Sequence, residues 1–171
     1  MKKSAINISK IIIATVITIA FTACPRNEPE PQKPIILVGQ FTWSEWKQKA
    51  GWADYSASDY TPNAEVLEEL KQIIDLDSIA FIVFSSSWCI PDCAPQMPRI
   101  MKLLQAIGYE QDSVLIYGLS RDKLQPAVPI LQYDIKFVPT LVIVNSDGMM
   151  GKIVEKPNES WEKHILTILE Q

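Results

Sequence analysis

The amino-acid sequence predicts an α/β domain built on one mixed sheet with helices on both faces. Continuous apolar runs rich in β-branched residues, at 79–84, 114–119 and 140–144, are typical of strands buried on both faces. Segments with helical periodicity separate these runs, so the early strands should be parallel and joined by crossover helices. The turn signal at 145–148 predicts a late antiparallel hairpin. The sheet therefore has four strands, or five if residues 35–38 also form one.

Residues 1–23 predict an export signal. Three lysines precede an apolar run over 11–21, which is shorter than the ~20 residues that a membrane-spanning helix needs. The sequence Phe-Thr-Ala-Cys at 21–24 resembles a bacterial lipobox, with phenylalanine where leucine is usual. The resemblance implies that Cys24 is acylated and becomes the new N-terminus. The alternative is a plain secretory signal that leaves Cys24 unmodified.

The next segment, 24–34, predicts an extended tether because four of its residues are prolines. Export would remove residues 1–23 and leave 148 of the 171 residues, enough for one ordinary domain. The formal net charge would move from −4 to −7, because the signal holds three lysines and no acidic residue. This acidity excludes an electrostatic footprint for nucleic acid. Attachment to a membrane must therefore come from acyl chains.

Residues 35–61 predict an N-terminal extension that packs on the main domain. Within it, 42–50 should be a short helix, with Thr42 and Glu45 as a capping box and Gly51 as the stop. Aromatic side chains here could line a partner-binding groove, but at such spacings they more often pack on their own domain, and we expect packing. The aromatic side chains in question are Trp43, Trp46 and Trp52.

Residues 62–171 predict the main domain, with helices where apolar residues recur three and four apart and strands where apolar runs are continuous. In chain order we expect a helix over 62–74, a strand over 79–84, a helix over 93–107, a strand over 114–119, a helix over 124–133 interrupted by Pro126 and Pro129, a strand over 140–144, a returning strand over 149–154, and a last helix that Ser160 caps and that ends at Leu169.

Cys89 and Cys93 lie at the junction between a predicted buried strand and a predicted helix, where function is expected in an open α/β sheet. A helix N-terminus stabilises a thiolate, and the thiolate is the species that attacks a disulfide. With Cys24 assigned to lipid, these are the remaining cysteines of an exported chain. A bridge that closes so short a loop constrains the unfolded chain little, so the pair is chemical rather than structural.

Several spaced motifs in residues 62–171 resemble the thioredoxin superfamily, in particular its bacterial TlpA-like, lipoprotein-type members. The matching residues are Trp88 directly before the first cysteine, Pro91 within the dithiol, Pro98 five residues past the second cysteine, Val138-Pro139-Thr140 at a strand start, and 151–155 after the hairpin turn. The resemblance implies a thioredoxin-like fold in which Cys89 attacks and Cys93 resolves. It also implies that Pro139, preceded by Val138, is a cis-proline beside the substrate disulfide.

Two features depart from the family pattern. Three residues separate Cys89 from Cys93 where the family has two, but positions i and i+4 still share a helix face and a bridge remains geometrically possible. An aspartate that many thioredoxins carry six residues before the first cysteine is replaced by Val83. Asp92 is the nearest substitute, and as a like charge it should disfavour a thiolate and make the couple more reducing. Equally, Asp92 could be an ordinary helix-start residue favoured by the dipole.

The sequence thus predicts a thiol–disulfide oxidoreductase anchored by lipid to a bacterial membrane, on the periplasmic side or the cell surface. Its expected partners are protein disulfides or dithiols and an upstream thiol reductant, with no nucleic acid, cofactor or bound metal. One alternative is a Sco-like copper chaperone, since thiolates suit Cu(I), although such proteins add a distant histidine and the single histidine here is His164. The other is an inactive thioredoxin-like interaction module.

Overall fold

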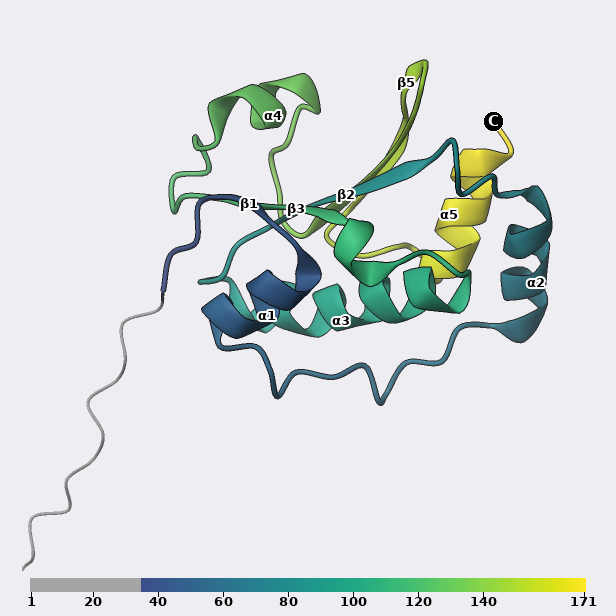
Figure 1. Cartoon of the computed structure of the whole chain (residues 1–171), viewed down its shortest axis with the longest axis horizontal. Helices are drawn as coiled ribbons and strands as arrows, with labels where there is room; N and C mark the ends of the chain where they lie inside the picture. Colours follow the sequence, from purple (N-terminus) through teal and green to yellow (C-terminus); the bar gives the residue numbers. More distant parts are fainter. Residues whose placement is uncertain (1–34) are drawn as a thin grey trace, which may run out of the picture. The chain divides into compact units, whose positions relative to one another are not determined.

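A five-stranded mixed sheet runs through residues 35–171, the part of the chain that this computed structural model describes (Figure 1). The export signal, Cys24 and the tether, all predicted within residues 1–34, lie outside the described residues. The strand order is β1-β3-β2-β4-β5, with β2 and β3 parallel and the other neighbours antiparallel. The strands are β1 Gly39–Phe41, β2 Ala80–Ser85, β3 Leu115–Gly118, β4 Thr140–Asn145 and β5 Gly148–Val154. The mixed sheet and its late hairpin are confirmed.

Helices cover both faces of this sheet. In Figure 1, α4 lies on the opposite side of the sheet from α1 and α3. The helices are α1 Trp43–Ala50, α2 Ala64–Ile73, α3 Ile90–Ala106, α4 Ala127–Gln132 and α5 Trp161–Leu169, with a short 3₁₀ turn at Gln111–Ser113. Within residues 35–171, none of these helices combines the length and apolar character needed to cross a membrane.

Two helix ends follow directly from local sequence chemistry. The Thr42 side chain accepts from the Glu45 backbone N–H while the Glu45 carboxylate accepts from the Thr42 backbone N–H, which completes the expected capping box of α1. Gly51 then ends α1 in the left-handed region, at φ 70°, where glycine has no steric penalty. Ser160 caps α5 by accepting from the Lys163 backbone N–H.

The expected bounds of two helices were wrong, both at prolines. Helix α3 begins at Ile90 rather than at residue 93, because Pro91 lies in the first turn, where a missing N–H costs no hydrogen bond. The segment 124–133 is not an interrupted helix. Pro126 stands directly before α4 and Pro129 lies in its first turn, so the helix starts after one proline and contains the other without a break.

The expected strand over 35–38 was also wrong, and β1 begins at Gly39 instead. The Leu37 backbone N–H donates to Ser87 Oγ at 3.0 Å, and Ser87 Oγ donates to the Ile35 carbonyl at 2.6 Å. These backbone groups are therefore bound by a side chain and not by a strand ladder. Strand pairing starts only where Gly39 comes opposite Gly118, whose missing side chain leaves room for Leu37 and Trp46 to pass closely.

The three N-terminal tryptophans pack into the core, as expected. Trp43, Trp46 and Trp52 are 4%, 0% and 1% exposed, and they belong to the same buried cluster as β2 and α3. The Trp46 ring lies edge-on to Phe41 at 5.6 Å and to Trp52 at 5.5 Å between ring centroids. Residues 35–61 thus complete the core that supports the rest of the sheet.

We expect Trp46→Ala to lower the free energy of unfolding by about 3–5 kcal/mol, because it removes a fully buried aromatic side chain and leaves a cavity. Urea denaturation of the full chain measures this loss. Tyr55→Ala is the matched control, since Tyr55 belongs to the same aromatic group but is 38% exposed and should cost much less. Equal losses in the two variants would contradict a core role for Trp46.

Candidate redox site

The cysteine pair lies where β2 passes into α3. Cys89 occupies the N-cap position of α3, and its carbonyl accepts from the Cys93 backbone N–H at 2.9 Å. Both thiols are free. Cys89 is partly exposed, whereas Cys93 is 0% exposed. A disulfide in solution can therefore reach Cys89 but not Cys93.

The environment of Cys93 disfavours its ionised form. Burial is the largest effect and raises the pKa of the Cys93 thiol, and the nearby Cys89 raises it further. The Ser86 backbone N–H and the Ser85 hydroxyl act in the opposite direction and lower this pKa. The net pKa lies well above the ordinary range, so Cys93 rests as a neutral thiol at physiological pH.

Asp92 lies beside Cys89 in the structure. The Cys89 thiol donates to Asp92 Oδ2 at 3.8 Å, a long contact at an exposed position. The carboxylate that the sequence offers as a substitute proton acceptor for Cys93 thus lies next to Cys89 instead. At the place of the missing family aspartate, Val83 is 0% exposed and leaves an apolar surface.

A buried acid does exist among the described residues, but its hydrogen bonds go elsewhere. Glu162 is 2% exposed and accepts from Tyr60 Oη at 2.7 Å and from the Asn63 backbone N–H at 2.8 Å. Burial would raise the pKa of Glu162, but these hydrogen bonds outweigh it and hold the pKa below its usual value. Glu162 therefore fastens the segment before α2 to α5 and does not take the place of the missing aspartate.

Trp88 joins the dithiol loop to the end of β3. Its indole N–H donates to the Leu119 carbonyl at 3.2 Å, and the Arg121 guanidinium lies 5.8 Å from its ring centroid. The loop that carries Cys89 is thereby held against the neighbouring parallel strand, and a cation–π contact covers the ring.

The Val138–Pro139 peptide bond is cis and directly precedes β4, as the resemblance implied. Strand β4 pairs with β2, with Thr140 opposite Phe84, so the proline stands at the same end of the sheet as the dithiol. Glu155 donates its backbone N–H to the Pro139 carbonyl at 2.6 Å. The same glutamate lines a surface hollow that also includes Pro91 and Asp92 of the dithiol segment.

Strand order, the parallel β2–β3 pair, the dithiol at the start of α3 and the cis-proline before β4 together decide the architecture. The fold is thioredoxin-like. No protein-family model matches the chain, and no curated protein matches it.

Three solved structures resemble this thioredoxin-like chain at low identity. A protein of unknown function from Pseudomonas aeruginosa is 17% identical over 72% of this chain and 84% of its own, with a TM-score of 0.47. An HIV epitope-scaffold is 16% identical over 72% of this chain and 84% of its own, with a TM-score of 0.49. A DsbH oxidoreductase is 16% identical over 65% of this chain and 83% of its own, with a TM-score of 0.36. At these values we draw nothing about activity from the three likenesses.

Large apolar side chains stand exposed next to the cysteine pair and the cis-proline of this thioredoxin-like domain. Ile90, directly after Cys89, is 44% exposed, and Phe137, just before the Val138–Pro139 bond, is 51% exposed. The segment leading into α4 and α4 itself expose Leu124, Val128 and Leu131 by 64%, 75% and 79%.

The residues of a Sco-like copper site do not come together. Within residues 35–171, no group of three His, Cys, Asp or Glu side chains is arranged to hold a metal ion. His164 lies on α5 in a surface hollow with Asn158, Glu159, Lys163 and Thr167, and neither cysteine lines that hollow.

Sequence reasoning overlooked the serines directly before Trp88. Ser85, Ser86 and Ser87 are 0%, 0% and 3% exposed. The available signal was a run of three hydroxyl residues at the end of a strand already expected to be buried.

We expect Asp92→Asn to shift the reduction potential of the Cys89–Cys93 couple upward by roughly 10–20 mV, because the Cys89 thiolate would no longer face a carboxylate and the reduced form would be stabilised. Equilibration of the full chain in glutathione redox buffers measures the potential. Glu155→Gln removes a carboxylate from the same hollow without a sulfur contact and serves as control. An unchanged or more negative reduction potential in Asp92→Asn would contradict an effect of the Asp92 carboxylate on the couple.

Proposed function

We propose that this protein is an extracytoplasmic thiol–disulfide oxidoreductase that reduces disulfides in partner proteins through Cys89 and Cys93. The observation that carries the proposal is the contrast between the two thiols at one helix start. Cys89 is accessible at the N-terminus of α3, and Cys93 is buried one turn behind it. A structural or metal-binding pair would have no need of this contrast.

The contrast supports a two-step exchange. The Cys89 thiolate attacks one sulfur of the partner disulfide, so a Cys89–partner bond forms and the partner's second sulfur leaves as a thiolate that takes up a proton. Cys93 then attacks the Cys89 sulfur, the Cys89–Cys93 bond forms, and the partner's first sulfur leaves and is protonated. The partner gains two electrons and the dithiol becomes a disulfide. An upstream thiol reductant must restore the dithiol before the next cycle.

The surroundings of Cys89 favour a polypeptide over a small disulfide as the substrate. Ile90 and Phe137 flank the dithiol and the cis-proline with exposed apolar surface. A partner chain that covers these side chains would gain binding energy from their burial, at about 25 cal/mol per Å² of apolar area. A small disulfide such as oxidised glutathione would cover little of that surface.

The sequence motifs of the first 34 residues support a location outside the cytoplasm. The export signal would deliver the chain across the membrane, lipid on Cys24 would hold it there, and the tether would let the domain stand some 30 Å away. An oxidising compartment is also where partner disulfides form and where an exported reductant has substrates.

We expect Cys93→Ser in the full chain to accumulate mixed disulfides with partner proteins, because Cys89 can attack but nothing resolves the product. Non-reducing electrophoresis after acid quenching detects these adducts, and Cys89→Ser is the control that should form none. The wild-type chain should also reduce insulin disulfides with a thiol reductant present, and both variants should lose this activity.

Copper carriage is the competing function, and a Cu(I) titration of the same protein tests it. Tight Cu(I) binding that His164→Ala abolishes, together with a Cys89–Cys93 bridge that never forms, would overturn the oxidoreductase proposal in favour of a chaperone. If the protein forms no adducts, does not reduce insulin and does not bind copper, the remaining alternative is an inactive thioredoxin-like interaction module.

We expect Cys24→Ser to abolish acylation and release the protein from the membrane fraction, because Cys24 is the proposed lipid site and the described helices offer no membrane span. Cell fractionation and mass spectrometry of the N-terminal peptide measure both effects. Cys89→Ser should remain acylated and membrane-bound. Continued membrane association of Cys24→Ser would contradict the lipid anchor.

A further inference from the structure

Two buried hydroxyl groups at the end of β2 have no hydrogen-bond partner. Among residues 35–171, neither Ser85 Oγ nor Ser86 Oγ meets a donor or acceptor in hydrogen-bonding geometry, and both residues are 0% exposed. The third serine of the run differs, because the Ser87 hydroxyl bonds the Ile35 carbonyl and the Leu37 backbone N–H. Buried hydroxyl groups are nearly always paired, so the two exceptions call for an explanation.

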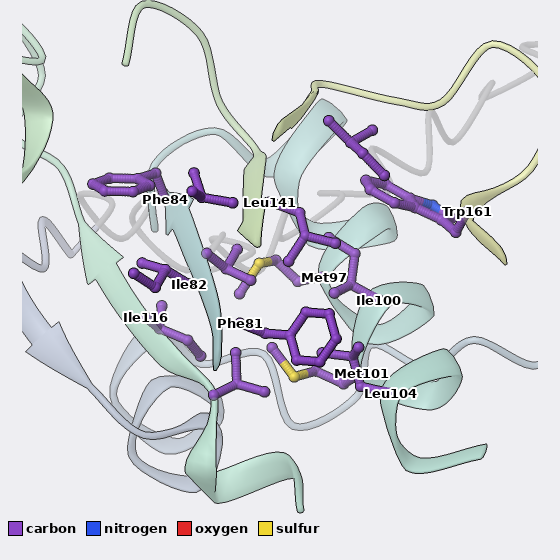
Figure 2. Packing of buried hydrophobic residues seen from close by; sticks show 14 of the residues in the cluster. Phe81, Ile82, Phe84, Met97, Ile100, Met101, Leu104, Ile116, Leu141 and Trp161 are labelled. Carbon is purple, nitrogen blue, oxygen red and sulfur yellow. The ribbon is translucent and has the colours of Figure 1, made fainter. Parts of the chain in front are cut away.

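The position of Ser85 in the strand directs its side chain toward α3. Alternate residues of a strand share a face, so Phe81, Val83 and Ser85 point to the same side of the sheet. Figure 2 shows Phe81 on that side, against the α3 side chains Met97, Ile100, Met101 and Leu104. Ser85 is the last residue of β2 and Cys93 lies in the first turn of α3, so the two meet at the same end of this interface.

The chemistry of this contact changes when Cys93 ionises. A neutral thiol is a weak hydrogen-bond acceptor, whereas a thiolate carries a full charge and accepts a strong, charge-assisted hydrogen bond. Burial and the nearby Cys89 raise the pKa of Cys93, whereas the Ser86 backbone N–H and the Ser85 hydroxyl lower this pKa by favouring the ionised form. Val83, which stands at the place of the missing aspartate, offers neither a charge nor a hydrogen bond.

We propose that the Ser85 hydroxyl is a donor held ready for the Cys93 thiolate, and that it assists resolution of the mixed disulfide in a site that lacks a buried acid. A donor that is unpaired in the ground state and paired only as charge develops lowers the barrier of that step. The inference rests on the proposed function, since resolution by Cys93 is the step that it serves.

Cys93 loses its proton and attacks the Cys89 sulfur, so the Cys89–Cys93 bond forms and the bond from Cys89 to the partner breaks. The bonding electron pair leaves on the partner sulfur, which takes up a proton. Ser85 donates its hydrogen bond to the Cys93 sulfur once Cys93 has lost its proton, and Ser85 itself neither gains nor loses a proton. Two electrons pass from the dithiol to the partner.

A matched pair of variants isolates the hydroxyl. Ser85→Thr keeps a hydroxyl, Ser85→Val has nearly the same shape without one, and both residues suit a strand. In the full chain with Cys24→Ser and Cys89→Ser, thiolate ultraviolet absorbance reports the pKa of Cys93 alone, because no other cysteine remains. We expect this pKa to be about one unit higher in Ser85→Val than in Ser85→Thr. Ser87→Ala, whose hydroxyl is engaged with Ile35 and Leu37, should leave the pKa unchanged.

Resolution is then followed in a single turnover. Each variant with both cysteines is loaded with glutathione on Cys89, and release of glutathione measures the rate. We expect Ser85→Val to resolve about tenfold more slowly than Ser85→Thr at neutral pH. The ratio of the two rates should narrow as the pH rises toward the raised pKa of Cys93, where ionisation in Ser85→Thr begins to saturate before ionisation in Ser85→Val. This pH profile separates a role in ionisation from a packing defect, which would slow the reaction at every pH.

Equal pKa values and equal rates in Ser85→Val and Ser85→Thr would overturn the inference, as would a rate difference that does not change with pH. Thermal unfolding of both variants establishes that they are folded to the same extent, and Ser85→Ala replaces the pair if their extra methyl groups prevent folding. Adduct formation by Cys93→Ser is independent of Ser85. Trapped partners with an unchanged Ser85→Val rate would therefore reject this inference while leaving the proposed function intact.

Discussion

The contact between helix α3 and strand β2 is the interaction on which the rest of the site depends. Phe81 and Leu141 on one face of the sheet meet Met97, Ile100 and Met101 on the helix, and all five side chains are at most 1% exposed (Figure 2). Close packing of this kind leaves little freedom for the helix to move. The first turn of α3 is therefore held against the end of β2, and Cys93 is buried because it lies on the packed side of that turn.

The properties of the two cysteines follow from this contact. Cys89 lies at the N-cap position of the helix and stays accessible, while Cys93 faces the sheet, where burial raises the pKa of its thiol. Trp88 adds a second restraint, because its bond to the Leu119 carbonyl holds the dithiol loop to β3. Pro139 approaches from β4 at the same end of the sheet. Three neighbouring strands thus position a site that none of them forms alone.

The sequence predicted elements well where the determining chemistry is local. The capping box of α1, the Gly51 stop and the 145–148 turn are all correct, because each depends on a few consecutive residues. The strand expected over 35–38 failed for a tertiary reason, since the Ser87 hydroxyl, some fifty residues away, binds the backbone of Ile35 and Leu37. Helix α3 begins three residues before its predicted start, because Pro91 fits the first turn of a helix, where its missing N–H costs no hydrogen bond.

By itself the sequence determined that two cysteines stand at a strand–helix junction, and its resemblance to thioredoxins implied that Val83 replaces an aspartate and that Val138-Pro139 is a cis-proline element. Only the tertiary structure decided which thiol is exposed, that Asp92 stands beside Cys89, and that the Ser85 hydroxyl is buried without a partner. The physical reason is that burial and pairing depend on which face of α3 meets which face of β2. Residue spacing specifies that two thiols can meet, whereas packing determines that Cys89 is accessible and Cys93 is buried.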